Sequence, residues 1–210
     1  MVDVAIVDYG MGNLRSVEQA MRKVAPTAEI IVTDDAEVIA NAKRVVFPGQ
    51  GAMPDCMREL DARGLRDAVL RAARSRPFLG ICIGLQMLFE HSAEGEVAGL
   101  GILQGKVARF ANHMLDTQGN KLKVPHMGWN QAHHVQHLLW EGIEQDARFY
   151  FVHSYYVQPL DASLVQATSQ YPHSFVCAVA KDNLFAVQFH PEKSQAAGLK
   201  LLHNFMQWNP

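Results

Sequence analysis

Cys82, His190 and Glu192 are the residues of this chain best suited to nucleophilic catalysis. Cys82 lies in Gly80-Ile81-Cys82-Ile83-Gly84, which has the form of a nucleophile elbow, a sharp turn from a strand into a helix. The flanking glycines give this turn room, because a Cβ atom there would collide with neighbouring backbone. The side chain is then presented at the end of the strand, where the amino terminus of the following helix favours thiolate over thiol. A cysteine held in this way is placed to attack a carbonyl carbon.

A cysteine nucleophile needs a base, and the base needs a group that orients it. Both occur in the segment Phe189–Ser194, which overlaps the end of a strongly apolar, strand-like run. Side chains at i and i+2 of an extended segment point to the same side. Glu192 can therefore accept a hydrogen bond from one imidazole nitrogen of His190 while the other nitrogen faces Cys82. The sequence predicts a Cys-His-Glu triad, provided that the fold bridges the long stretch between Cys82 and His190.

An oxyanion hole is the third requirement, and two segments are expected to form it. One donor is the backbone amide of Ile83, next to the nucleophile. The second comes from Gly49, Gln50 and Gly51, where the two glycines let the backbone adopt positive φ and turn an amide inward. Functional loops of open α/β sheets gather at the carboxyl ends of strands, and both segments fit this rule. A plain strand-to-helix turn is the alternative for the Gly49–Gly51 loop.

The elements that must position these residues alternate between strands and helices in the first half of the chain. Strands are predicted at 2–8, 28–33, 43–47 and 77–81, and helices at 13–24, at 55–75 with a break at Gly64, and from 84 to His91. This alternation indicates an α/β fold, with a mostly parallel sheet covered by helices on both faces. Short β-rich runs follow at 106–110, 121–124, 149–157, 164–169, 175–180 and 184–189, before a terminal helix at 196–208. We expect these runs to be antiparallel additions to the same sheet, so that residues 1–210 form one domain.

Composition excludes several classes of function. Hydrophobic residues make up 49% of the chain and charged residues 19%, with a formal net charge of −2, which is ordinary for a soluble globular protein. The chain has no excess of basic residues that would indicate binding to nucleic acid. No apolar run approaches the roughly 18 residues that a membrane helix needs. The start of the chain lacks the basic region of a signal peptide.

The three cysteines, Cys56, Cys82 and Cys177, are odd in number and widely spaced, which favours a reducing cytoplasmic compartment over a disulfide framework. Cys56 and Cys177 are predicted to be core residues.

Two further patterns favour a structural interpretation. Gly10-Met11-Gly12 follows a strand but lacks the third glycine of a dinucleotide-binding loop, because position 15 is arginine, so a turn is predicted. His133, His134 and His137 have a spacing typical of metal ligands, but no carboxylate or cysteine neighbours them in the sequence. A solvated loop is the better interpretation, and we expect neither a metal nor a cofactor.

Three segments resemble the class I (triad) glutamine amidotransferases, cysteine glutaminases that feed ammonia to a partner site. They are Gly80–Gln86, Pro48–Gly51 and Phe189–Glu192. Within that class the chain most resembles the glutaminase subunits of imidazole glycerol phosphate synthase, over nearly its whole length. The segments that narrow the resemblance from the class to these subunits are Val7–Leu14, Pro125–Asn130, Tyr150–Tyr156 and His190–Ser194. The resemblance implies a flavodoxin-like fold of the class I amidotransferase type.

This resemblance also implies a substrate and a partner. Gln86, together with backbone around His153, Ser154 and Tyr155, would hold the amino-acid end of L-glutamine. The partner in the heterodimer would be a (β/α)8-barrel cyclase, through whose interior ammonia passes to a nucleotide substrate. The products would be imidazole glycerol phosphate and aminoimidazole carboxamide ribotide, in histidine biosynthesis. Lys121 and Lys193 are either contacts of that interface or solvated surface lysines.

Three alternatives compete with this interpretation. A glutaminase subunit of another amidotransferase, such as anthranilate synthase, would keep the chemistry and change the acceptor, but segments 125–130 and 150–156 argue against it. A thiol hydrolase or peptidase would need no partner, but Gln86 and the His190-Pro191-Glu192 segment argue against it. A non-catalytic scaffold is disfavoured by an intact Cys-His-Glu set. We also hypothesise that the Gly49–Gly51 loop rests with its donor turned away until the partner binds its substrate.

Overall fold

The first half of the chain builds the parallel part of a long sheet. In the computed structural model, which describes residues 2–116 and 118–210, the strand order is β2-β1-β3-β4-β14 and every neighbouring pair in this run is parallel. The strands are β1 (Val4–Val7), β2 (Ile30–Thr33), β3 (Arg44–Gly49), β4 (Phe78–Cys82) and β14 (Leu184–Val187). All residues of β1, β4 and β14 are buried, as expected for parallel strands covered on both faces.

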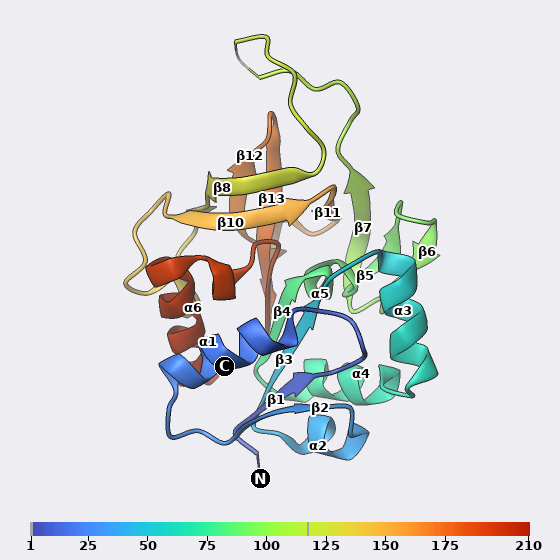
Figure 1. The fold of residues 1–210 in the computed structure, drawn as a ribbon, viewed down its shortest axis with the longest axis vertical. Coiled ribbons are helices and arrows are strands. Elements are labelled where there is room, and N and C mark those ends of the chain that lie inside the picture. The colour runs from blue at the N-terminus through green and yellow to red at the C-terminus, as the bar shows by residue number, and fades with distance from the viewer. Residues whose placement is uncertain (1, 117) are drawn as a thin grey trace.

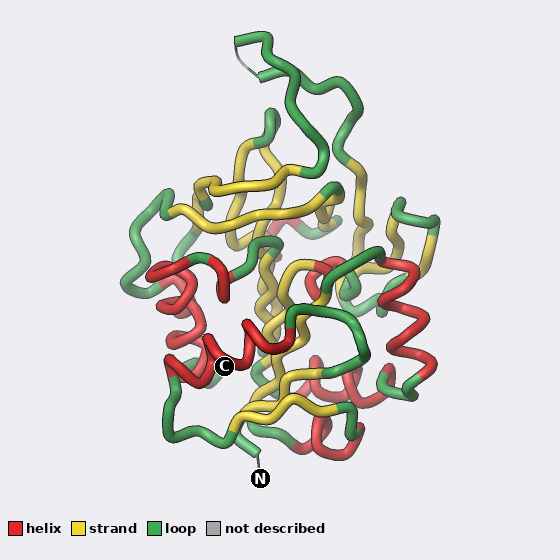
Figure 2. The backbone as a smooth tube through the Cα atoms, viewed as in Figure 1, coloured by secondary structure: helices red, strands yellow, loops and turns green. Residues whose placement is uncertain are grey.

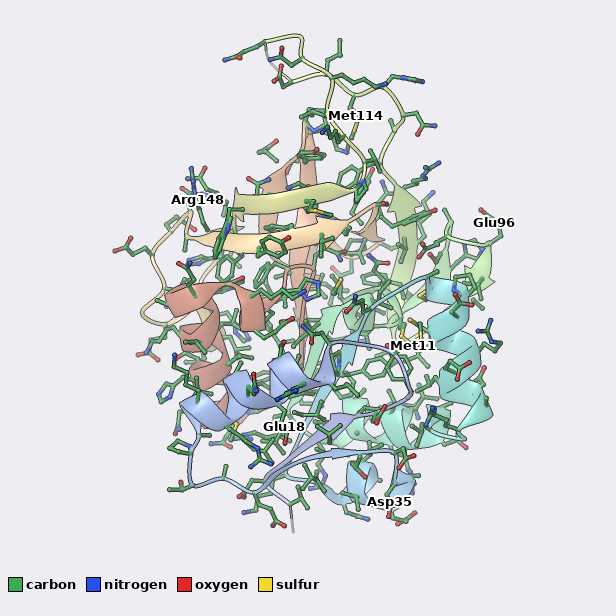
Figure 3. The ribbon with its side chains drawn as sticks, viewed as in Figure 1. Met11, Glu18, Asp35, Glu96, Met114 and Arg148 are labelled. Carbon is green, nitrogen blue, oxygen red and sulfur yellow. The ribbon has the colours of Figure 1, made fainter. Side chains whose placement is uncertain are left out.

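Helices cover this sheet on both sides, as predicted (Figures 1 and 2). They are α1 (Leu14–Val24), α2 (Ala36–Asn41), α3 (Met53–Ala62), α4 (Arg66–Ser75) and α6 (Gln195–Gln207). Helix α1 packs against α6, and α2 packs against α4. The predicted break is confirmed at Gly64, whose φ of +66° separates α3 from α4. Helix α2 was not predicted; Asp35 (Figure 3) caps it by accepting hydrogen bonds from the amides of Glu37 and Val38.

The second half extends the sheet with antiparallel strands, also as predicted. The order continues from β14 through β13, β11, β7, β5 and β6, while β12 pairs with β13 and β9. The bounds are β5 (Phe89–Ser92), β6 (Val97–Ala98), β7 (Leu103–Arg109), β9 (His133–His134), β11 (Tyr155–Pro159), β12 (Val165–Gln170) and β13 (Ser174–Lys181). Strands β5 and β7 are parallel to each other and depart from this pattern. Three 3-10 turns lie at Leu138–Trp140, Ala162–Leu164 and Pro191–Lys193.

A separate two-stranded sheet lies beside the carboxyl ends of the parallel strands (Figure 1). It pairs β8 (His126–Gln131) with β10 (Arg148–His153) in antiparallel register. The predicted single run at 149–157 is therefore wrong. The chain breaks at Ser154, because β10 pairs with β8 whereas β11 pairs with β7 and β13.

Two other predicted elements are also wrong. The helix expected from Gly84 to His91 is only the short α5 (Ile83–Gln86), and the segment from Phe89 is strand β5. The carbonyls of Met87, Leu88 and Phe89 accept hydrogen bonds from amides in the segment 100–103, so pairing with distant backbone replaces helical bonds. No strand forms at 121–124 within the described residues; Lys121 makes an isolated bridge to Leu115.

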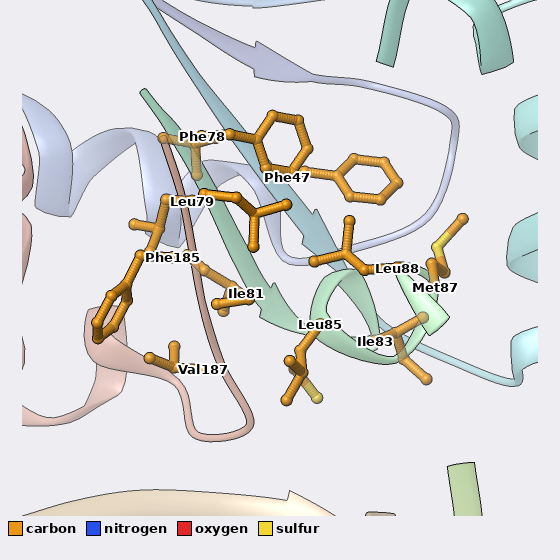
Figure 4. Close-up of a cluster of buried hydrophobic side chains, with 14 of the residues drawn as sticks. Phe47, Phe78, Leu79, Ile81, Ile83, Leu85, Met87, Leu88, Phe185 and Val187 are labelled. Atoms are coloured by element: carbon orange, nitrogen blue, oxygen red, sulfur yellow. The ribbon is translucent and has the colours of Figure 1, made fainter. Parts of the chain in front are cut away.

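Aromatic and aliphatic side chains fill the core beneath the end of β4 (Figure 4). The rings of Phe47 and Phe78 lie 5.8 Å apart, and Tyr9 lies 5.5 Å from Phe47. Ile81 and Val187 are also buried there, on β4 and β14. This packing fixes β3, β4 and β14 against one another, so the positions of their carboxyl ends are set by the core. No helix in the described ranges is long and apolar enough to cross a membrane.

Candidate active site

Cys82 lies at the turn from β4 into α5, in a backbone conformation that residues other than glycine rarely adopt. Its φ is 56° and its ψ is −111°, the strained geometry typical of a nucleophile elbow. A Cβ atom at Gly84 would collide with the carbonyl oxygen of Phe47, and one at Gly80 would lie 3.0 Å from the Cβ of Ala186. The predicted collision is therefore confirmed at Gly84, whereas a Cβ at Gly80 would be crowded without colliding.

Sheet register explains why distant residues meet at Cys82. Strand β3 pairs with β4 so that Gly49 lies opposite Cys82. On the other side, Val187 of β14 lies opposite Ile81 of β4, so the chain leaving β14 passes directly beside Cys82. The carboxyl ends of three adjacent parallel strands therefore bring the elbow, the Gly49–Gly51 loop and the His190 segment together, as open α/β sheets do with functional loops.

The structure brings His190 and Glu192 together next to Cys82. The Nδ1 atom of His190 lies 2.8 Å from Oε1 of Glu192, and both side chains are buried. The Nε2 atom of His190 is buried and has no hydrogen-bond partner in the described part of the chain. Burial lowers the pKa of His190, but the charge of Cys82 and the hydrogen bond to Glu192 outweigh it and raise the pKa to about 10. A protonated His190 is therefore favoured when Cys82 carries a negative charge.

Ser194 ties His190 to the small sheet. Its hydroxyl donates to the carbonyl of His190 at 2.6 Å and accepts from the amide of Tyr150 at 2.9 Å. The amide of His190 donates to the carbonyl of Tyr150, also at 2.9 Å. Ser194 is completely buried. Ser194 was predicted only as part of the resemblance, and its contact with His190 was not, because the partner strand is remote in the chain.

A pocket of about 340 Å³ opens beside Cys82 and His190. It is lined by most of the residues that the sequence analysis selected: Gln50, Gly51, Cys82, Ile83, Gln86, His153, Ser154, Tyr155 and His190. Gly49 is absent from this lining. The predicted positive φ occurs at Gly51, whose φ is +108°, and not at Gly49. Gly49 is needed for space, because a Cβ there would collide with the Tyr9 hydroxyl and lie 2.9 Å from Ile83 Cβ.

Gln86 offers a free acceptor to this pocket. Its Nε2 donates to the carbonyl of Tyr155 at 3.1 Å and to Oε1 of Gln188 at 3.0 Å. Its own Oε1 is buried without a hydrogen-bond partner among the described residues. A buried acceptor left open is costly unless a ligand fills it, and an ammonium group is a suitable donor.

Two buried histidines support the segment that carries Ser154 and Tyr155. His153 Nδ1 lies 2.7 Å from the carbonyl of Tyr155, and its Nε2 lies 2.9 Å from Nδ1 of His126. The Nε2 of His126 lies 3.2 Å from Nδ2, the side-chain amide nitrogen, of Asn130. Because the Tyr155 carbonyl can only accept, Nδ1 of His153 carries a proton. When both rings are neutral, Nδ1 of His126 donates to Nε2 of His153, and Nε2 of His126 accepts from the side-chain amide of Asn130. Burial lowers the pKa of His126 to about 4 and that of His153 to about 3, in agreement with neutral rings.

Sequence reasoning missed His126, Asn130 and Gln188 as members of the site. Gln188 is completely buried, and its Nε2 lies 3.9 Å from Cys82 Sγ. Gln188 precedes His190 by two residues, so the alternation of side chains along an extended segment could have found it. For Glu192 the predicted extended segment is wrong, because Pro191–Lys193 form a 3-10 turn, which nevertheless brings Glu192 to His190. No comparable spacing rule connects His126 with His153.

The other patterns have structural roles. Cys56 and Cys177 are free and fully buried, which confirms that they are core residues, and burial raises the pKa of both thiols. His134 stacks on Trp140 with 4.8 Å between ring centroids, and His137 packs against Phe185. Within residues 2–116 and 118–210, no group of three or more His, Cys, Asp and Glu side chains is arranged to hold a metal ion.

Comparisons with known proteins agree with the fold and show the family. The family of class-I glutamine amidotransferases matches residues 5–208. A crystal structure of a glutamine amidotransferase superposes with a TM-score of 0.72 at 18% identity, covering 98% of this chain and 97% of that one. PurLQS from Thermotoga maritima superposes with a TM-score of 0.69 at 16% identity, covering 97% of each chain. The chain belongs to the class-I glutamine amidotransferases and is an enzyme of that class.

More similar relatives narrow the family further. The imidazole glycerol phosphate synthase subunit HisH of Nitrosospira multiformis is 66% identical over the whole of both chains. The HisH subunit of Thiobacillus denitrificans is 65% identical over all of this chain and 92% of that protein. Within the class, the chain therefore belongs to the HisH family.

Proposed function

We propose that this protein is the glutaminase subunit of imidazole glycerol phosphate synthase and hydrolyses L-glutamine to glutamate and ammonia. The observation that carries the proposal is His190, held by Glu192 and placed beside a cysteine on a strained elbow, at the wall of a pocket. The HisH relatives, at up to 66% identity over the full chain, support the same assignment.

In the proposed mechanism the proton of Cys82 resides on His190 before substrate arrives, in keeping with the raised pKa of His190. The thiolate attacks the side-chain amide carbon of glutamine, and the amides of Ile83 and of the Gly49–Gly51 loop stabilise the oxyanion. His190 then gives its proton to the leaving ammonia, which leaves a thioester on Cys82. His190 next accepts a proton from water, and the hydroxide formed attacks the thioester, which releases glutamate and restores the Cys82 thiolate beside the protonated His190. Loss of one oxyanion donor is expected to lower the rate by about 10²- to 10³-fold.

The amino-acid end of glutamine is proposed to bind at Gln86 and the segment His153–Tyr155. The open acceptor of Gln86 suits the substrate ammonium, and the backbone of Ser154 and Tyr155 lines the same pocket. The His126–His153 pair holds the carbonyl of Tyr155 in place, so the pocket is formed before substrate binds.

The partner is proposed to be a (β/α)8-barrel cyclase that docks over the small sheet. Two large apolar side chains of β8, Met127 and Trp129, are exposed by 62% and 44%. Strand β8 pairs with β10, whose Tyr150 and Val152 line the pocket, so a protein docked there would receive ammonia directly. The cyclase would then form imidazole glycerol phosphate and aminoimidazole carboxamide ribotide, in cytoplasmic histidine biosynthesis. Residues 1–210 would act as one domain of the heterodimer.

The Gly49–Gly51 loop is proposed to switch when the partner binds its substrate. The carbonyl of Gln50 accepts a hydrogen bond from Cys56 Sγ at 3.6 Å, which fixes the plane of the Gln50–Gly51 peptide in the resting chain. Breaking that single weak bond would free the peptide to turn.

Ammonia release from glutamine tests the proposal. The purified chain should be slow alone, and much faster with the cyclase and its nucleotide substrate, and Cys82→Ala should abolish the activity. Absence of ammonia under both conditions would refute the glutaminase assignment and favour a scaffold. Full activity of the isolated chain would refute the switch in the Gly49–Gly51 loop.

A further inference from the structure

Gln188 is a buried polar residue beside the nucleophile to which the mechanism above gives no role. It follows directly after β14, and the register that places Val187 opposite Ile81 places Gln188 beside Cys82. Its side chain is 0% exposed, although its amide carries two donors and an acceptor. Burying such a group is unfavourable unless its hydrogen bonds are satisfied.

The orientation of the Gln188 amide follows from its neighbours. The carbonyl of Tyr155 can only accept, so the atom of Gln86 that lies 3.1 Å from it must be the amide nitrogen. That nitrogen also lies 3.0 Å from Gln188, so Gln188 must present its oxygen there. The remaining side of the Gln188 amide is its NH2 group, which lies 3.9 Å from Cys82 Sγ.

We propose that Gln188 is a further catalytic residue, which donates an N–H to the Cys82 thiolate and holds Gln86 through its carbonyl. This inference rests on the proposed glutaminase function. A thiolate in a buried site needs donors, and His190 must give its proton to the leaving ammonia. Gln188 cannot lose its proton at any working pH, so it keeps the sulfur in one position throughout the cycle. Its carbonyl meanwhile keeps the free oxygen of Gln86 available to substrate.

The reactivity of Cys82 tests this inference independently of glutamine. Alkylation by iodoacetamide is followed against pH, with Cys82 separated from Cys56 and Cys177 by peptide mass spectrometry. In Gln188→Met, which keeps the size of the side chain, the midpoint of the pH profile should move up by about one pH unit, as expected for one lost hydrogen bond to a charged group. In Gln188→Glu, which keeps the acceptor but adds a negative charge, it should move further. Glutaminase kcat/KM should fall about tenfold or more in both variants.

A control separates contact from general damage. Val187→Ala removes buried volume from the neighbouring residue, whose side chain points to the opposite face of the strand. It should lower the unfolding temperature and leave the alkylation midpoint unchanged. If Gln188→Met does not fold, Gln188→Glu, which has the native shape, decides the question.

Unchanged midpoints in the folded Gln188 variants would overturn the inference, whatever their activity. If the midpoints shift in the Gln188 variants but the wild-type protein releases no ammonia, the contact with Cys82 is supported and the glutaminase function is refuted. The two failures are therefore distinguishable.

Discussion

Acid is expected to destabilise this fold through the buried pair His126 and His153. Their folded pKa values of about 4 and about 3 lie below the unfolded value of 6.5. Between these values the unfolded chain binds protons that the folded chain does not, so stability is complete above pH 6.5 and is lost as the pH falls. His190 does not act in this window, because its pKa of about 10 keeps it protonated in the folded chain, and its contribution is nearly constant below pH 6.5.

The magnitude follows from proton linkage. Between pH 6.5 and 5, each of the two histidines should remove about 1.5 kcal/mol from the free energy of unfolding, or about 3 kcal/mol together. Both side chains are nearly completely buried, at 4% and 6% exposure, so solvent screening is small. His126→Phe keeps a ring between Phe151 and Tyr171 and removes one titrating group.

Urea unfolding at pH 6.5 and 5, followed by tryptophan fluorescence, provides the measurement. The wild-type protein should lose about 1.5 kcal/mol more than His126→Phe between the two pH values. His137, whose pKa is also lowered by burial, is present in both proteins and cancels in this difference. Equal losses in the wild type and His126→Phe would refute the linkage of stability to this pair.

Three further predictions follow from contacts around the elbow. Gly84→Ala should lower the unfolding free energy by about 1–3 kcal/mol in urea titrations, because its Cβ meets the Phe47 carbonyl oxygen; a neutral result would contradict the crowding there. Ser194→Ala should cost about 1–3 kcal/mol, because it leaves the Tyr150 amide unpaired and removes one of the two hydrogen bonds that the His190 carbonyl accepts. It should also lower kcat, whereas Ser194→Thr should retain more of the stability and of kcat. Glu192→Gln should move the basic limb of the pH profile of kcat/KM to lower pH, because Glu192 helps to raise the pKa of His190. If the limb does not move, Cys82 alone raises the pKa of His190.

The parallel half of the fold was predictable because its signals are local. Apolar runs such as Phe78–Ile81 are buried on both faces. Gly64 marks a turn whose φ of +66° favours glycine, and Gly84 marks a close approach where a Cβ would meet the Phe47 carbonyl oxygen. The elbow at Cys82 is equally local, since strand, nucleophile and turn are contiguous. The residues proposed for the triad could be selected for the same reason, because His190 and Glu192 are two positions apart.

What could not be predicted depends on pairing between remote segments. Residues 87–92 carry a helical apolar pattern, yet their carbonyls bond to segment 99–103 and form a strand edge. His126 and His153 meet only because β8 pairs with β10 in a register that sets them opposite each other. No single-sequence pattern contains that register, so the network that supports Tyr155 became visible only in the structure.

Strand β14 has a consequence for how this protein is made. It is the second-last regular strand or helix of the chain, yet it lies in the interior of the sheet, between β4 and β13. During synthesis, β1 to β4 emerge from the ribosome long before β14, and the edge of β4 stays open until then. Cys82 therefore exists for much of translation without His190 beside it. On this order of synthesis, β4 has an unpaired edge that is open to non-native pairing, and His190 can reach Cys82 only after β14 has joined the sheet.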